Sequence, residues 1–514
     1  MAHWIPGASA LDKPVGLHPE THSPNPVHAG ALDLPVVKKT LGWGALALAS
    51  ACATAPQRVE REPLPAIAWP DDSRATQLLV LNRVSFGPSR ASMQEIETLG
   101  TGAYLAQQLR PAAEPHLPPE VQAAIDSMTI SKRSVVDLAT ELEQRQREFR
   151  NLPPGEMKAE RQAYQQELTR LAREAAARTL LRALYSPDQL QEEMTWFWMN
   201  HFSVFQGKAN VRVLVGDYEE RAIRPHALGR FGELLGAVAR HPAMLVYLDN
   251  SRNAVGRINE NYARELMELH TLGVKGGYTQ ADVQELARVL TGFHVRDGGF
   301  HFFPRRHDYG QKTLLGQPVR SSGERELGEA LELLASHPST SRFIARKLAV
   351  HFVADDPPEA LVERMARAFR ASEGDIALTL GAMFESPEFR ASLGGKFKDP
   401  LHYMVSAVRF AAGEQPIPRE GVERMINALA AMGQPLYGRP TPDGYPLVRG
   451  EWTSPGQLAA RFEVARGVGY RRVGRLPDEL PVPLSDTTRQ TLSKASDPRE
   501  WNLLLLSSPE FMSR

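Results

Sequence analysis

The chain has 514 residues, and its 60 Lys and Arg residues balance its 60 Asp and Glu residues, so the formal net charge is +0. A neutral chain offers no overall basic surface, which argues against nucleic acid as a partner and against polybasic binding to a membrane. The single cysteine, Cys52, excludes an intramolecular disulfide and a cysteine-ligated zinc site. A chain of this length can bury a large core, in one large domain or in two closely packed ones.

Cys52 lies where a bacterial lipoprotein signal would place a cysteine. A basic pair at 38–39 is followed by an uncharged run at 40–50, small residues and the cysteine, the order typical of an export signal peptide. The run is shorter than the roughly 20 apolar residues that span a bilayer. The motif resembles the lipobox, so we expect removal of residues 1–51 and a membrane anchor on Cys52, which would also exclude thiol catalysis. By resemblance to Gram-negative sorting rules, Ala53 indicates the outer membrane.

Residues 1–35 precede the basic pair and are rich in Pro, His and Gly. An extension of this length would bury an export signal, which belongs near the start of the chain. We therefore expect translation to begin at Val36 or Val37, read as an alternative start codon, with a true N-terminal extension as the alternative. Residues 52–72 contain several prolines and are predicted to form an extended tether. Neither the extension nor the tether is expected to pack stably.

Residues 73–514 are predicted to form a mainly α domain, a large multi-helix unit, because apolar residues recur at helical spacing nearly throughout. A charged stretch at 131–184, interrupted by Pro153-Pro154-Gly155, predicts a helical hairpin with a solvated outer face. Strand patterns are sparse, and the best is a small β-hairpin excursion at 299–315. The Gly-, Pro- and aromatic-rich residues 433–456 predict a long ordered loop that aromatic side chains anchor over the core.

The densest polar cluster of the sequence is at 259–270. At about 100° per residue, one face of this predicted helix is apolar; its residues are Ile258, Tyr262, Leu266, Leu269 and Leu272. Glu265 falls within that face, with Glu268 on one shoulder and His270 on the other. A carboxylate turned toward a core must be paired, coordinated or protonated.

Two further predicted helices place ionisable groups toward the core. His201 lies within the apolar face of 188–204, and Lys347 and His351 lie within that of 342–352. Together with Glu265, these groups indicate a shared polar interior that could form a site.

For this interior we expect His201 and Glu265 to act as acid/base groups or ligands, with Lys347 and Arg264 setting the local charge. Glu268 and His270 are candidates beside them. The alternative is a structural network in which an arginine or Lys347 binds Glu265 and a backbone carbonyl binds His201.

His307 and Asp308, four residues before Lys312, are candidate metal or phosphate ligands, with a simple turn capped by Asp308 as the alternative. Glu265 and Glu268 alone are a weak metal pattern, and no HExxH or HxH motif accompanies them. The sequence contains no nucleophile elbow, phosphate-binding loop or dinucleotide fingerprint, and it identifies no particular cofactor.

These segments resemble a bacterial family known as domain of unknown function 1800. The matching stretches are 81–88, 197–202, 241–245, 259–273, 277–283, 307–308 with Lys312, and 337–340. The resemblance extends from about Leu78 to the C-terminus. It implies an exported, mostly helical protein and assigns no catalytic residues.

Two functions remain open from the sequence. One is a hydrolytic envelope enzyme that acts on an extracellular polymer or conjugate through the buried His, Glu and Lys residues. The other is a non-catalytic envelope module that supports a partner protein. Genes of the resembled family often neighbour those of a sulfatase-like family, domain of unknown function 1501, so the resemblance implies such a protein as the partner.

Overall fold

The computed structural model describes residues 64–111, 117–469, 476 and 481–514. By its internal contacts the chain divides into two units, 1–54 and 55–514, and every described residue belongs to the second. The export signal and Cys52 lie outside the described residues, so the predictions made for them stay predictions.

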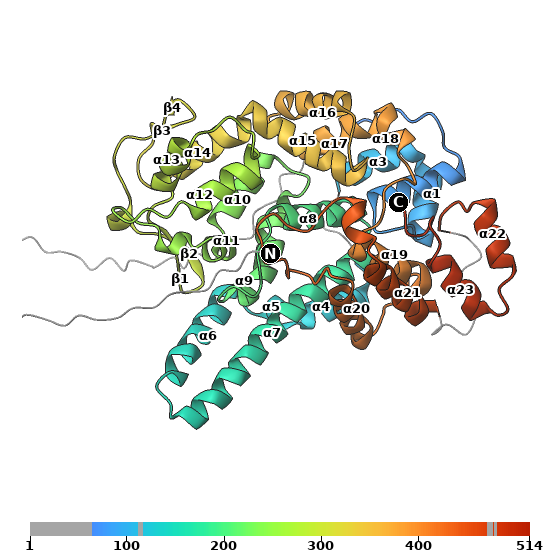
Figure 1. Ribbon diagram of the computed structural model, residues 1–514, viewed down its shortest axis with the longest axis horizontal. Coiled ribbons are helices and arrows are strands. Elements are labelled where there is room, and N and C mark those ends of the chain that lie inside the picture. Colours follow the sequence, from blue (N-terminus) through green and yellow to red (C-terminus); the bar gives the residue numbers. More distant parts are fainter. Residues whose placement is uncertain (1–63, 112–116, 470–475, 477–480) are drawn as a thin grey trace, which may run out of the picture. The chain divides into compact units, whose positions relative to one another are not determined.

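The described part of the chain is mainly α-helical, as the apolar spacing predicts (Figure 1). The helices before the strands are α1 (Arg74–Val84), α2 (Arg90–Leu99), α3 (Thr101–Leu109), α4 (Pro119–Ser127), α5 (Thr129–Lys132), α6 (Val135–Phe149), α7 (Pro154–Tyr185), α8 (Gln189–His201), α9 (Val211–Asp217), α10 (Phe231–Arg240), α11 (Pro242–Tyr247), α12 (Asn261–Glu265) and α13 (Gln280–Val289). Those after the strands are α14 (Arg325–Ser336), α15 (Pro338–Phe352), α16 (Glu359–Ala371), α17 (Ile376–Phe384), α18 (Pro387–Ala391), α19 (Pro400–Ala412), α20 (Arg419–Ala431), α21 (Pro455–Gly469), α22 (Asp486–Ser493) and α23 (Pro498–Leu506).

Tighter and wider helical turns connect several of these helices. The π-helical segments are η1 (Tyr218–Ile223) and η4 (Leu266–Thr271), and the 3-10 segments are η2 (Arg224–His226), η3 (Asn250–Arg252), η5 (Pro304–Arg306) and η6 (Arg449–Trp452). Among the described residues, no helix is both long enough and apolar enough to cross a membrane.

Two small antiparallel ladders follow α13. Their strands are β1 (Phe293–Arg296) with β2 (Gly299–Phe302), and β3 (Thr313–Leu314) with β4 (Gln317–Pro318). The predicted excursion at 299–315 therefore has the wrong start, because the first strand begins at Phe293. Asp297 and Gly298 turn the chain with φ of 50° and 70°. Asp-Gly is a preferred pair for a two-residue hairpin turn, and the sequence analysis overlooked it.

The predicted helical hairpin is confirmed as α6 and α7, which run side by side (Figure 1). Pro154 occupies the first position of α7, where its missing N–H costs no hydrogen bond. The two helices bury a narrow apolar seam, in which the Phe149 and Tyr164 rings lie 5.6 Å apart between centroids. An ion pair of 3.0 Å joins Arg145 to Glu160 across the pair.

Within residues 64–72, the end of the predicted tether, Leu64, Ile67 and Trp69 pack against the core, while most of the other residues are exposed. Ile67 is 6 % exposed, and its amide donates to the Gly102 carbonyl at 3.1 Å. The Trp69 and Phe389 rings meet edge to face with centroids 6.3 Å apart. The prediction of an unpacked tether is wrong for this stretch, because burying large apolar side chains offsets the entropy lost by ordering it.

Helix α8 is enclosed on every side. All of its residues are buried, and it packs against α1, α3 and α7 (Figure 1). An enclosed helix is ordinarily apolar all round. α8 instead carries Glu193 and His201 into the interior, and each of these side chains needs partners there.

Candidate functional site

Several of the buried ionisable groups lie where side chains of α8 approach those of α15. Glu193, Phe197 and His201 follow at four-residue intervals on α8, and Lys347 and His351 do so on α15, so each set shares a helix face. The Phe197 ring centroid lies 5.2 Å from that of His351 and 6.3 Å from that of His201. Phe197 therefore lies between two polar clusters, one around Lys347 and one around Glu193.

The Lys347 cluster comprises Lys347, His201 and His270, together with Asp443 and Glu265, which are linked to it because the charge of Asp443 acts on both Lys347 and Glu265. His201 is 1 % exposed, and its Nε2 donates to the His270 backbone carbonyl at 3.0 Å. Among the described residues, His201 Nδ1 and both ring nitrogens of His270 meet no hydrogen-bond partner. Burial, and then the Lys347 charge, holds the pKa of His201 well below its usual value and lowers the pKa of His270 to about 3. Both imidazoles are therefore neutral.

Lys347 retains some solvent exposure. Its ammonium lies 5.6 Å from the centroid of the Phe343 ring. Within the described ranges it has no hydrogen bond or ion pair, so its charge is only partly compensated. Burial lowers the pKa of Lys347 to about 8, while the negative charge of Asp443 opposes that fall.

Glu265 is half-buried rather than enclosed. Burial raises the pKa of Glu265, the charges of Glu268 and Asp443 raise it further, and Arg264 opposes the rise. Arg264 itself forms an ion pair with Glu260 at 3.0 Å. In the part of the chain that the structure describes, Glu265 has no direct ion pair, so the predicted pairing with Lys347 or an arginine is not found there.

The helical-face prediction fails after Glu265 because the helix changes its pitch. α12 ends there and continues as the π-helical η4, in which hydrogen bonds reach one residue further back. A rotation of 100° per residue no longer applies. His270, predicted on a shoulder, is therefore fully buried. Ile258, predicted in the apolar face, is 40 % exposed for a different reason, because the helix begins only at Asn261.

The long loop at 433–456 reaches the Lys347 cluster. The prediction that it is ordered is confirmed, since Tyr437, Tyr445 and Trp452 are all buried. The loop is tied to α8 by two hydrogen bonds, from the Tyr445 amide to Asn200 Oδ1 at 2.6 Å and from Asn200 Nδ2 to the Tyr445 carbonyl at 2.9 Å. It thereby supplies Asp443, whose charge acts on both Glu265 and Lys347.

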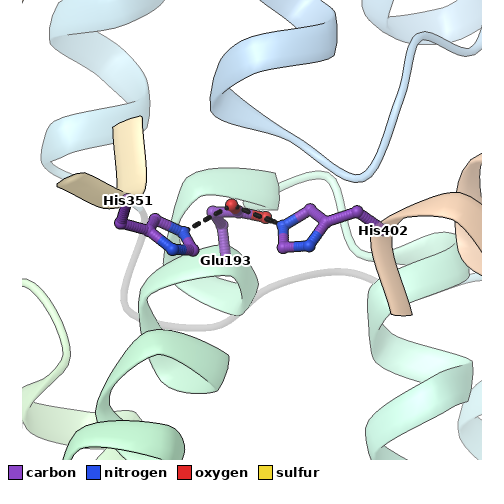
Figure 2. Close-up of side chains that lie close together, drawn as sticks. All are labelled: Glu193, His351 and His402. Atoms are coloured by element: carbon purple, nitrogen blue, oxygen red, sulfur yellow. Dashed lines mark hydrogen bonds and ion pairs between the residues drawn. The ribbon is translucent and has the colours of Figure 1, made fainter. Parts of the chain in front are cut away.

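The Glu193 cluster comprises Glu193, His351, His402, Asp399 and Arg514. Figure 2 shows the first three converging from α8, α15 and α19, with both imidazoles turned toward the carboxylate. His351 Nε2 lies 2.9 Å from Glu193 Oε1, and His402 Nε2 lies 2.7 and 2.8 Å from the two carboxylate oxygens. Arg514 also donates to Glu193 Oε1. One ligand atom from each of Glu193, His351 and His402 lies within 4.8 Å of the others, and all three side chains are buried.

The charges of this cluster are strongly coupled. Burial opposes ionisation of Glu193, but Arg514 and then His402 outweigh it and hold the pKa of the carboxyl well below its usual range. His402 is held between two carboxylates, because its Nδ1 lies 2.7 Å from Asp399 Oδ1. Burial and Arg514 disfavour a charge on this ring, yet Asp399 and Glu193 raise its pKa. Burial and Arg514 lower the pKa of His351 to about 4.

The predicted metal candidates His307 and Asp308 are directed to different partners. His307 Nε2 lies 3.2 Å from Glu326 Oε1, beside an ion pair of 2.7 Å between Lys312 and the other oxygen of Glu326. Asp308 forms an ion pair of 2.9 Å with Arg288 and accepts from the Gly310 amide, as a capping turn residue would. Among the described residues, they do not join a third ligand to make a metal group.

A cavity of about 1410 Å³ lies apart from both clusters. It is lined by residues of α1, α2, α19, α20 and α21, which include apolar side chains and several arginines. None of the predicted site residues lines it.

The family model described as "Protein of unknown function (DUF1800)" matches residues 79–513. The chain belongs to this family. No curated protein and no solved structure matches it. The matched residues, 79–513, include every residue of both clusters except Arg514.

The sequence indicated His201, His270, Glu265 and Lys347 but not Glu193 or His402. The charge of Lys347 acts on His201 and His270, and Glu265 is linked to Lys347 through Asp443, whose charge acts on both. Glu193 lies eight residues before His201 on the same face of one helix, and that spacing could have indicated it. No local pattern indicates that His402 faces Glu193, because the two are 209 residues apart in the chain.

Proposed function

We propose that the chain is an exported envelope lipoprotein whose helical domain hydrolyses an extracellular polymer or conjugate, with Lys347 and Glu265 transferring protons. The main support for this proposal is the half-buried Lys347 ammonium, for which the described residues provide no hydrogen bond or ion pair. A buried charge without a partner costs free energy that an apolar residue at the same place would avoid. Such perturbed groups concentrate at functional sites.

The two groups suit complementary parts of one reaction. With a pKa near 8, Lys347 is partly neutral around neutral pH, and its free amine can accept a proton from an attacking water. Burial and the charges of Glu268 and Asp443 raise the pKa of Glu265, which favours the protonated form that can donate to a leaving group. His201 and His270 are enclosed and neutral, which makes them positioning residues beneath Lys347.

Hydrolysis of a panel of p-nitrophenyl esters, phosphates, sulfates and glycosides by the purified full chain tests this proposal. We expect turnover of at least one probe and a bell-shaped dependence of the rate on pH, because the reaction needs the neutral amine of Lys347, whose pKa is about 8, together with the protonated carboxyl of Glu265. Lys347→Met and Glu265→Gln should each lower the rate by about 100-fold or more, the usual contribution of a general acid or base.

Matched controls are Lys275→Met and Glu332→Gln, which remove a lysine and a glutamate from exposed positions. Both should keep the wild-type rate, and all four variants should keep the wild-type melting temperature within a few degrees. Absence of hydrolysis with every probe class, by a folded protein, would overturn the enzymatic proposal and favour a non-catalytic envelope module that supports a sulfatase-like partner.

A further inference from the structure

We propose that Glu193, His351 and His402 bind a divalent transition-metal ion of the zinc type, which ties α8, α15 and α19 together. The inference concerns the Glu193 cluster and is independent of the proposed proton transfer by Lys347 and Glu265. It rests on the convergence of three ligand atoms within 4.8 Å from helices that are far apart in the chain.

The hydrogen bonds of His402 leave one of its ring nitrogens aimed at the carboxylate. Asp399 accepts the backbone N–H of His402 at 2.9 Å as the cap of α19, and the same carboxylate oxygen lies 2.7 Å from His402 Nδ1. A ring that donates from Nδ1 has, when neutral, a lone pair on Nε2. That lone pair points at the oxygens of Glu193, so a cation or a proton must lie between them.

His351 points to the same conclusion. Its Nε2 lies 2.9 Å from Glu193 Oε1 and 3.3 Å from Arg514 Nη2. A guanidinium can only donate, so an Nε2 that accepts from Arg514 has no hydrogen for the carboxylate. Both imidazoles can therefore present lone pairs to the centre of the cluster.

The Asp399 contact has the form found around metal-bound imidazoles. A histidine ligand usually donates its other ring nitrogen to a carboxylate or carbonyl, which fixes its tautomer and orientation. Asp399 does this for His402 from the first turn of the same helix. Apolar packing alone would not require a carboxylate there.

Arg514 has to remain compatible with a bound cation. Its guanidinium bonds to Glu193 Oε1, and Glu193 Oε2 lies 2.8 Å from His402 Nε2. An ion bound through Oε2 and the two Nε2 atoms would displace Arg514 Nη2 from His351 Nε2, which lies 3.3 Å away, while the guanidinium keeps its bond to Glu193 Oε1 and so still orients that carboxylate.

The donor set selects the class of metal. Two imidazoles and one carboxylate suit Zn²⁺ and related first-row divalent ions, whereas Ca²⁺ and Mg²⁺ prefer oxygen ligands throughout. Three protein ligands leave one position of a tetrahedral zinc ion for water. Because all three side chains are buried, the ion would stabilise the fold rather than meet a substrate.

The test measures metal content in the full chain, purified without a polyhistidine tag and incubated with Zn²⁺ and then, after chelation, with Co²⁺. We expect about one Zn²⁺ per chain by elemental analysis, a lower melting temperature after chelation, and a visible Co²⁺ ligand-field spectrum. Glu193→Gln and His402→Gln should lower the metal content at least tenfold. Asp399→Asn should weaken affinity by about 10–100-fold, as loss of an orienting carboxylate does.

His307→Gln is the matched control, because His307 is also buried and also contacts a glutamate, Glu326. It should keep the full metal content. A folded wild-type chain that takes up neither Zn²⁺ nor Co²⁺ would overturn the proposal and assign the cluster to a proton shared between His402 and Glu193. Since that outcome is read on the wild-type chain, it holds even if a variant fails to fold.

Discussion

Lys347 and His351 lie one turn apart on the same face of α15, but they differ in their partners and in their solvent exposure. His351 meets Glu193 at 2.9 Å inside the protein. Lys347 reaches a partly open region, where the nearest acidic influence is Asp443 on the long loop. Burial lowers the pKa of both residues, because it penalises the charged form of any base.

The pKa of Lys347 can be measured without a substrate. Competitive labelling of amines with acetic anhydride across pH should give a midpoint near 8 for Lys347, because only the neutral amine reacts. The exposed Lys275 is labelled in the same experiment as the control. Asp443→Asn should shift the Lys347 midpoint further down, since it removes the negative charge that favours the ammonium. An unshifted midpoint equal to that of Lys275 would contradict the assignment.

At the scale of elements, the change of pitch between α12 and η4 decides which side chains enter the Lys347 cluster. A π-helical turn adds a residue per turn, so it rotates every later side chain relative to an α-helix. This rotation carries His270 into the interior and leaves Glu268 half-buried, whereas Glu265, which precedes it, is half-buried at the end of α12. Periodicity of the sequence correctly indicated a polar helix at the site, but it misplaced the residues beyond Glu265.

The loop at 433–456 is held by Tyr437 as well as by its contacts with α8. The Tyr437 hydroxyl donates to Glu219 Oε2 at 2.7 Å and lies 2.7 Å from Thr179 Oγ1. Burial raises the pKa of Glu219, so its carboxyl depends on these neutral hydrogen bonds.

Tyr437→Phe should therefore destabilise the protein by about 1–3 kcal/mol, the usual cost of leaving a buried polar group with fewer partners. Thermal melts would show this loss, and limited proteolysis should cut the loop faster. Tyr309→Phe is the control, because Tyr309 is 56 % exposed. Equal stability of the two variants would show that the Tyr437 hydroxyl does not anchor the loop.

At the scale of the whole molecule, membrane attachment depends on residues outside the described ranges. The predicted anchor is Cys52 with a diacylglycerol thioether, and two or more acyl chains are needed for stable attachment. We expect mass spectrometry of the membrane fraction to find a mature chain that begins at a lipidated Cys52. Cys52→Ala should leave the chain unlipidated and lower its recovery in membranes. Recovery of residues 1–51 on the wild-type mature protein would contradict both the signal and the internal start.

The sequence by itself determined the helical class, the α6–α7 hairpin, the ordered loop and the family. Each of these depends on local information: apolar spacing, prolines, aromatic residues and motifs within short stretches. The sequence also indicated that α8 and α15 carry ionisable groups toward the core, because the position of such a group within an apolar face can be read from a single helix.

Only the tertiary structure decided which of those groups meet. Glu193 and His351 are 158 residues apart, and Glu193 and His402 are 209 apart, so no local pattern records their contact. The pitch of η4 and the packing of residues 64–72 were likewise decided by neighbours across the fold. Sequence periodicity reports which face of a helix is buried, whereas the packing of separate helices selects the partner that a buried charge finds there.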